Sequence, residues 1–271
     1  MNRGLLLKSW RETWPPTVLF GGALFVIQAI LAFALPKLQS QLSAQLASTP
    51  FLRNLIGAMI GTDVGGGLGP EMFAAIAWVH PVVLALVWAH AIVLCTRVPA
   101  GEVDRGTIDV LLALPVSRWQ VFVTESLVWV GAAFSIIVAA LLGNAVVARL
   151  GGNALDIAVT RLLPVAANLL AIATSVGAFA WLASCLSDRR GRALAVALLA
   201  VLASFLLNYL APFWEPANRI AWLSVLRYHQ PVRVLQSGQW PFADLGVLLG
   251  AAALMWVVAG TVFARRDLTT T

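Results

Sequence analysis

The sequence predicts an all-α integral membrane protein with six transmembrane helices, and three observations support this prediction. The chain of 271 residues is 60% hydrophobic and only 11% charged, whereas soluble domains carry about 25% charged residues. Its apolar residues gather in six long segments, and its lysines and arginines favour alternate loops between them. A soluble fold of this size could not bury so much apolar surface, but lipid accepts it.

A helix rises about 1.5 Å per residue, so about 20 apolar residues cross a hydrocarbon core of about 30 Å. The sequence offers six such segments, which we expect to form one domain over residues 1–271. They occupy residues 17–35, 72–94, 121–147, 162–186, 193–210 and 245–263.

The basic residues predict the orientation of the chain. If the N-terminus lies inside, eleven of the 18 lysines and arginines fall on the inner side, although the outer loops are longer. The densest cluster, 188–192, joins spans four and five. Both termini are therefore expected in the cytoplasm. The net charge of +6 does not indicate nucleic-acid binding, because the chain has no basic run and no platform of interleaved aromatic and basic residues.

Residues 5–14, which precede the first span, are predicted to form an amphipathic helix. Leu6, Leu7, Trp10 and Trp14 share one helical face. We expect this helix to lie in the membrane interface and to enter span one at Pro15-Pro16.

The inner loop 96–120 predicts a short amphipathic helix that begins near Glu102 and stops before Pro115. Ser117 and Gln120 form a capping-box pattern that opens span three. The apolar side of this helix needs burial, either by this protein's own helix ends or by a partner. At helical spacing, one face holds Glu102, Arg105 and Asp109, and the other Val103, Val110, Leu111 and Leu114.

Two long outer segments connect spans one and two and spans five and six. Residues 36–71 end in a glycine-rich stretch, 65–69, that predicts a turned or flexible loop. Residues 211–243 carry Trp214, Trp222, Tyr228 and Trp240, which suit a membrane interface, so this segment either arches through water or dips back into the membrane. A solvated loop is the expected setting for its charged and imidazole groups, Glu215, Arg227 and His229.

The inner loop resembles the cytoplasmic loop of ABC-2 type permeases. The resemblance lies in Glu102, Gly106-Thr107, Leu111-Leu112 and Pro115-Val116-Ser117-Arg118, with a departure at Ala113-Leu114, where relatives often carry serine. The ending 263–268 and the segment 222–231 also resemble this family.

This resemblance implies a six-span permease of the bacterial inner membrane that forms a homodimer or heterodimer on two copies of a separate ATPase, which holds ATP and Mg²⁺. The loop helix would dock in a groove of the ATPase, and the loop between spans four and five would make a smaller contact. The coupling residues carried over are Glu102, Asp104, Arg105, Gly106, Thr107, Asp109, Leu111, Leu112, Pro115, Ser117 and Arg118. The second contact comprises Asp188, Arg189, Arg190 and Arg192.

Ionisable groups within spans are functional candidates, and two stand out here. Glu125 is either a helix-start carboxylate paired with an arginine or a group that acts in transport or coupling. His80 either bonds a neighbouring helix or the backbone freed by Pro81, or relays protons. Because the two lie at different depths, we expect no catalytic pair between them.

The predicted function is that of a transport subunit without chemistry, cofactor or metal of its own, and the resemblance favours export. The chain contains no GxxxxGK[ST] motif, so ATP hydrolysis is expected in the partner. A proton-driven secondary carrier is the alternative, and a membrane enzyme a weaker one, since HExxH and GxSxG are also missing. Gly21-Gly22 in span one, together with span five, are the expected dimer contacts.

Overall fold

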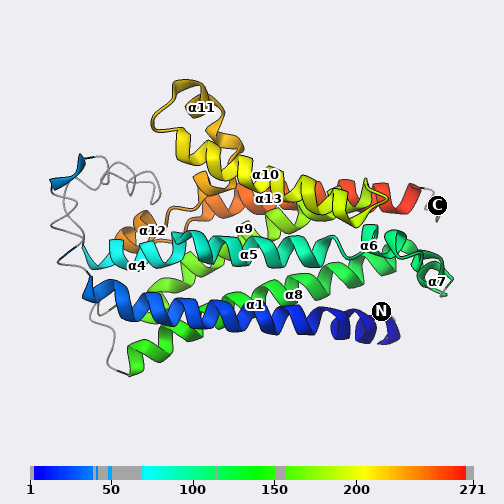
Figure 1. Cartoon of the computed structure of the whole chain (residues 1–271), viewed down its shortest axis with the longest axis horizontal. Coiled ribbons are helices and arrows are strands. Elements are labelled where there is room, and N and C mark those ends of the chain that lie inside the picture. Colours follow the sequence, from blue (N-terminus) through cyan, green and yellow to red (C-terminus); the bar gives the residue numbers. More distant parts are fainter. Residues whose placement is uncertain are drawn as a thin grey trace.

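The computed structural model describes residues 3–38, 41, 48–50, 69–113, 115–150 and 157–266, with the backbone alone for Leu112. Within these ranges every regular element is helical. Six helices are long and apolar enough to cross a membrane, which confirms the predicted all-α membrane fold. They lie side by side along the long axis of the molecule (Figure 1). The predicted glycine-rich stretch 65–69 falls almost entirely outside the described residues, as do Leu114 and the last two residues of the family-like ending.

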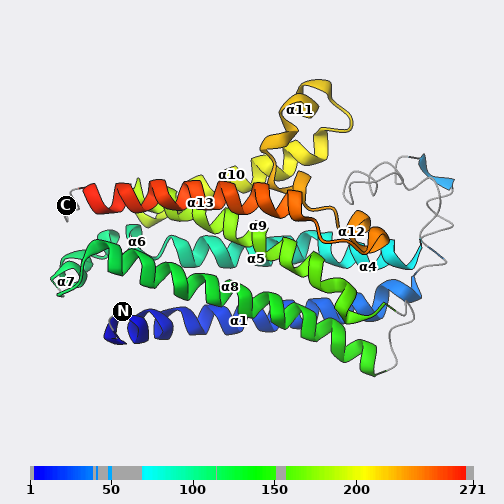
Figure 2. The same cartoon turned by 180° about the vertical axis from the view of Figure 1, so that it is seen from behind.

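The two ends of the bundle differ in what they carry. The N-terminus, the C-terminus and the short helices α6 and α7 gather at one end, here called the loop end (Figures 1 and 2). The opposite end, here called the far end, carries α12 and the start of α4, while α11 projects from the side of the bundle (Figure 1). Both termini therefore lie at the same end as the loop between spans two and three.

The first span is one continuous helix, α1 (Arg3–Lys37), with Pro15 and Pro16 inside it. The predicted helix over residues 5–14 therefore runs into span one through these prolines without a break. The helix continues because its polar stripe, not its apolar face, turns inward: Ser9 and Thr13 are buried, whereas Trp10 and Trp14 are about half exposed. The inward polar groups find partners on other helices, as described below.

The second span consists of α4 (Pro70–Val79) and α5 (Pro81–Cys95), which meet at His80. Pro81 cannot donate a backbone hydrogen bond, and a residue before proline favours extended geometry. His80 adopts a ψ of 129°, and its Nδ1 accepts a hydrogen bond from the Val82 amide at 3.3 Å. His80 thus caps the second half of its own span, which agrees with the backbone-bonding interpretation.

The loop between spans two and three contains two short helices, α6 (Ala100–Asp104) and α7 (Ile108–Leu112), where the sequence predicted one. The break falls at Gly106, whose φ of +69° lies in the left-handed region that glycine adopts without steric cost. The next helix, α8 (Arg118–Arg149), begins with the predicted capping box. Ser117 Oγ accepts from the Gln120 amide at 3.2 Å, and Gln120 Oε1 accepts from the Ser117 amide at 3.0 Å.

The most buried span is α9 (Val159–Cys185), which packs against α5, α8, α10 (Arg190–Leu210) and α13 (Phe242–Arg265). Helix α1 runs along α8, so closely that a Cβ at Gly143 would lie 2.2 Å from the Phe25 carbonyl oxygen. Only 17% of the most apolar window of α10 and 22% of that of α1 is buried. These two spans therefore have the most side-chain surface left for lipid or for another subunit.

The segment between α10 and α13 first projects from the bundle at α11 and then returns to the far end at α12 (Figure 1). It contains α11 (Glu215–Ile220), η1 (Ala221–Leu223), η2 (Val225–Tyr228) and α12 (Pro231–Ser237). His229 is buried here, with Nδ1 2.7 Å from Asn168 Oδ1 and Nε2 3.4 Å from the Trp78 carbonyl oxygen. A solvated setting for His229 was therefore a wrong prediction, because α12 packs on α4 and carries the histidine into the bundle.

Candidate functional site

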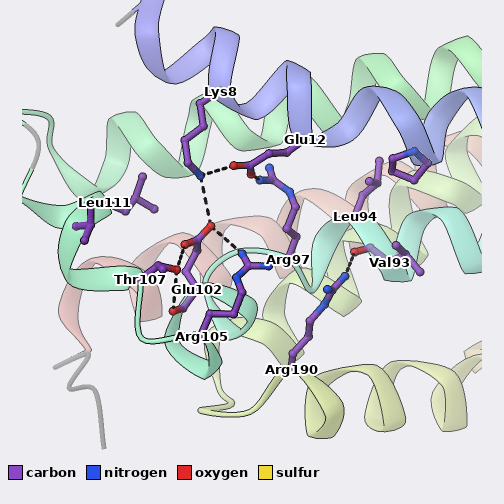
Figure 3. Close-up of a pocket in the computed structure, with 12 residues that line it drawn as sticks. Lys8, Glu12, Val93, Leu94, Arg97, Glu102, Arg105, Thr107, Leu111 and Arg190 are labelled. Carbon is purple, nitrogen blue, oxygen red and sulfur yellow. Dashed lines mark hydrogen bonds and ion pairs between the residues drawn. The ribbon is translucent and has the colours of Figure 1, made fainter.

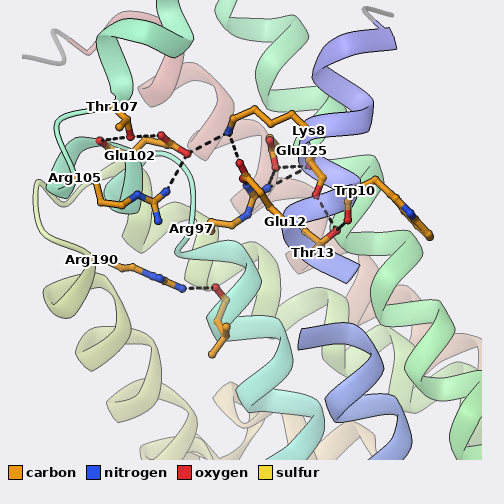
Figure 4. A network of polar contacts seen from close by, with 12 residues as sticks. Lys8, Trp10, Glu12, Thr13, Arg97, Glu102, Arg105, Thr107, Glu125 and Arg190 are labelled. Atoms are coloured by element: carbon orange, nitrogen blue, oxygen red, sulfur yellow. Dashed lines mark hydrogen bonds and ion pairs between the residues drawn. The ribbon is translucent and has the colours of Figure 1, made fainter. Parts of the chain in front are cut away.

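A buried arginine at the loop end connects three elements. Arg97 follows α5 and is 7% exposed. Its guanidinium forms ion pairs with Glu12 of α1 and Glu125 of α8 (Figure 4). Ser9 adds a hydrogen bond from its hydroxyl to Glu125 Oε2 at 2.8 Å. Glu125 is thus a carboxylate near the helix start paired with an arginine, the first of its two interpretations, while a role in transport stays a prediction.

A second carboxylate extends this network into the loop. Glu102 of α6 is 4% exposed and accepts from Lys8 of α1 at 3.3 Å and from Arg105 at 3.0 Å. The Thr107 hydroxyl also bonds to it, and Lys8 reaches Glu12 at 2.9 Å. The carboxylates and cations therefore form one connected network from the loop through α1 to α5 and α8 (Figure 4).

The charge state of Glu102 follows from these neighbours. Burial raises the pKa of the Glu102 carboxyl, but the Thr107 hydrogen bond and the charges of Lys8 and Arg105 outweigh burial, and the net pKa is lowered. A negatively charged Glu102 is thus held inside the protein by its own neighbours. This carboxylate positions the loop on α1 and is not presented to solvent.

The network borders a cavity of about 680 Å³ at the loop end (Figure 3). Val93 and Leu94 of α5 line it, and both α1 and α10 pack on this helix. Charged and apolar side chains share the lining. These residues are Lys8, Glu12, Pro16, Val93, Leu94, Arg97, Glu102, Arg105, Thr107, Val110, Leu111 and Arg190.

The loop between spans four and five is held by the C-terminal end of the last span. Arg266 forms an ion pair with Asp188 and donates to the Cys185 carbonyl at 2.6 Å. Arg118 in turn bonds the carbonyl oxygens of Phe263 and Arg266. Asp188 and Arg118, both predicted as contacts with a partner, therefore also make contacts within this chain.

A family model described as ABC-2 family transporter protein matches residues 16–268. The chain belongs to this family. The resemblance of the inner loop is thereby confirmed, and with it the assignment as a membrane permease of an ABC transporter, a class that works with an ABC ATPase. No curated protein matches the chain.

In this ABC-2 permease, the residues of the loop that carries the predicted coupling residues divide into a buried and an exposed group. Glu102 and Leu111 are buried, at 4% and 3% exposure. The exposed group begins with Val110, which is 71% exposed, whereas the sequence placed it with the buried side. Other exposed positions of the loop are Asp104, Arg105, Gly106, Thr107, Asp109, Ala113, Pro115 and Ser117.

The sequence did not single out Ser9, Glu12 or Arg97, which complete the network. Their signal was present but weak: Lys8 and Glu12 stand four apart on one helix, and Ser9 and Thr13 form a polar stripe. His80 stands apart from the network, since its ring bonds Val82 of its own span. Among the described residues, no three His, Cys, Asp or Glu side chains gather where they could hold a metal ion.

Proposed function

We propose that this ABC-2 permease forms the translocation path of a bacterial exporter and receives force from a separate ATPase through the α6–α7 loop. The proposal is carried by one observation: the two sides of this loop differ in burial. Its inner side is fixed by Glu102, while Val110 and its exposed neighbours leave side-chain surface open to a partner. ATP and Mg²⁺ are held by the ATPase in this scheme.

The loop is well placed to move several spans at once. It follows α5 and leads directly into the capped start of α8. The ion pair between Lys8 and Glu102 adds α1 to this unit. A push on the exposed surface would therefore reach α1, α5 and α8 together.

In the proposed assembly two permease subunits, identical or homologous, sit on two ATPase subunits in the inner membrane, with the loop end in the cytoplasm. The low burial of α1 and α10 supports these helices as the subunit contact. Gly21 is less suited to it, because a Cβ there would lie 3.6 Å from Ile136 Cγ2 of α8. A Cβ at Gly22 would meet no atom within 4 Å, so Gly22 can still contact another subunit.

Val110→Asp tests the coupling proposal. The side chain is 71% exposed, so the variant should insert and fold normally but lose about tenfold or more in ATPase association, because a buried charge at an interface costs several kcal/mol. Leu150→Asp is the matched control, since Leu150 is 81% exposed at the far end of α8. The readouts are copurification of the ATPase and transport-coupled hydrolysis.

Wild-type association and coupling in Val110→Asp would overturn the proposed role of the loop. Leu111→Asp is a poorer probe, since Leu111 is buried within the chain and the variant should be unstable. Glu102→Lys should loosen the loop from α1, because it reverses the charge that holds Lys8.

A further inference from the structure

We infer that the cavity at the loop end binds the phosphodiester headgroup of an anionic phospholipid. The cavity is lined by four cationic side chains and two carboxylates. Lys8, Arg97 and Arg105 are each paired with Glu12, Glu102 or Glu125. The fourth cation, Arg190, has no ion-pair partner among the described side chains. One positive charge on the cavity wall is therefore left to be neutralised.

Arg190 is held in place, but its hydrogen-bonding capacity is not used up. One terminal nitrogen donates to the Val93 carbonyl oxygen at 3.1 Å (Figure 3). Its Nε is buried and has no hydrogen-bond partner within the described structure. Gly101 makes room for this side chain, since a Cβ there would lie 3.2 Å from Arg190 Cδ and 3.3 Å from the Thr96 carbonyl oxygen. The guanidinium is thus preorganised, and its terminal nitrogens, with the one hydrogen bond to Val93, keep donors for a ligand.

The surrounding charges favour an anion beside Arg190. Arg105 lies next to it (Figure 4), and the charges of Arg105 and Arg97 act on it as like charges. A phosphate oxygen accepts charge-assisted hydrogen bonds from guanidinium groups and relieves their mutual repulsion. Asp104 also acts on Arg190, but it does not reach ion-pair distance. An external anion therefore supplies what the chain leaves open.

The apolar part of the lining identifies the anion as a lipid. Pro16, Val93, Leu94, Val110 and Leu111 line the same cavity as the cations. The first three belong to membrane-spanning helices, so the cavity lies where a hydrocarbon core meets its polar surface. Basic pockets between transmembrane helices at this level suit phospholipid headgroups. A volume of about 680 Å³ is within the range of small-molecule sites.

This inference uses the proposed orientation only to say which leaflet supplies the lipid. Binding is measured on the permease without the ATPase. The purified full-length protein in neutral detergent is titrated with phosphatidylglycerol or with phosphatidylcholine of the same acyl chains. Bound lipid is counted by native mass spectrometry, and the Tm is recorded in parallel. Inorganic phosphate and glycerol 3-phosphate form separate arms, which distinguish a lipid from a free phosphate.

Wild-type protein should prefer phosphatidylglycerol to phosphatidylcholine and rise in Tm with it. Arg190→Gln should lower the affinity for phosphatidylglycerol about tenfold, since it removes a charge-assisted contact. Arg105→Gln, at a half-exposed side chain that tolerates replacement, should lower it about threefold and serves as the test if Arg190→Gln does not fold. Arg192→Gln is the matched control, because Arg192 is exposed on the same helix and should change the affinity less than twofold.

Three results would overturn the inference. The first is that Arg190→Gln and Arg105→Gln both retain the wild-type preference for phosphatidylglycerol. The second is that Arg192→Gln loses as much affinity as Arg190→Gln, which would indicate diffuse surface attraction. The third is that inorganic phosphate or glycerol 3-phosphate binds as tightly as the lipid. A failure of Val110→Asp to uncouple the ATPase would leave all of these measurements unchanged, so the two proposals fail separately.

Discussion

The two ends of the bundle are held together by different chemistry. At the loop end, buried carboxylates and guanidiniums connect α1, α5, α6 and α8, as in the pair of Arg97 with Glu125. At the far end, neutral groups pair inside the bundle, as His229 does with Asn168, while the ion pair of Arg233 with Asp244 has its arginine 57% exposed. Ionic contacts inside a protein are costly to break and sensitive to the removal of one partner, whereas neutral ones are cheaper.

This difference between the ends agrees with the proposal that the loop receives force from the ATPase. A charged network has a small number of discrete pairings, so a movement of the loop can exchange Lys8 between Glu12 and Glu102, which it reaches at 2.9 and 3.3 Å. At the far end, neutral contacts hold the returning segment on α4, α9 and α10, together with a hydrogen bond from Arg161 to the Leu235 carbonyl oxygen. We therefore expect the loop end to respond to force and the far end to stay fixed.

The largest expected effect is that of Glu125→Ala. The change leaves Arg97 buried with Glu12 as its one remaining carboxylate, and loss of one partner of a buried pair costs about 3–5 kcal/mol. Asn168→Ala is the matched change at the far end, where loss of neutral hydrogen bonds should cost about 1–3 kcal/mol. Denaturant titration in mixed micelles gives the free energy of unfolding for both variants. Equal losses would break the comparison between the ends.

The next effect is a dependence of stability on pH, which arises from His229 at the far end. Burial lowers the pKa of His229 from 6.5 to about 4, against a smaller opposing effect of the Trp78 carbonyl. The unfolded state therefore binds the proton more readily, so stability is lost as pH falls below 6.5. At pH 5 the loss should be about 2 kcal/mol relative to pH 8.

Glu102 behaves differently over the same range, which sharpens the comparison. Its pKa is lowered from 4.5, so its contribution is fully present above that value and is lost only as pH falls further. His229→Gln should therefore remove the share of the change between pH 8 and pH 5 that His229 contributes, as measured by Tm. Glu102→Gln should leave that change in place. The opposite pattern would assign the titration to the loop end.

The sequence predicts the spans well because each depends on the average polarity of about 20 neighbouring residues. It predicts the site less well, because Arg97 and Glu125 are 28 positions apart and each alone resembles a charge at a helix end. The helix break at Gly106 separated Val110 from Leu111, which the sequence placed on one face, since a short helix reoriented by a turn presents a different face. His229 was misplaced because local composition does not show that α12 returns to the bundle.

A smaller effect is expected from Ser117→Ala at the loop end. The Ser117 side chain caps α8 through the Gln120 amide at 3.2 Å, and loss of such a cap costs about 1 kcal/mol. Gln120→Ala tests the other half of the same box. Hydrogen exchange should speed up in the first turn of α8 for both variants and stay unchanged in α13. Exchange that rises equally in α13 would show that the cap supports the whole loop end.

The smallest effect is expected from Arg219→Ala, although it also breaks an ion pair. Arg219 and Glu215 pair at 3.2 Å on α11, and both side chains are 76% exposed. Water solvates each partner after the change, so the loss should be at most about 0.5 kcal/mol. Comparing its unfolding free energy with that of Glu125→Ala isolates burial as the variable, because each change removes one partner of a carboxylate–arginine pair. A loss at Arg219 close to that at Glu125 would mean that pairing, and not burial, sets the strength of the network at the loop end.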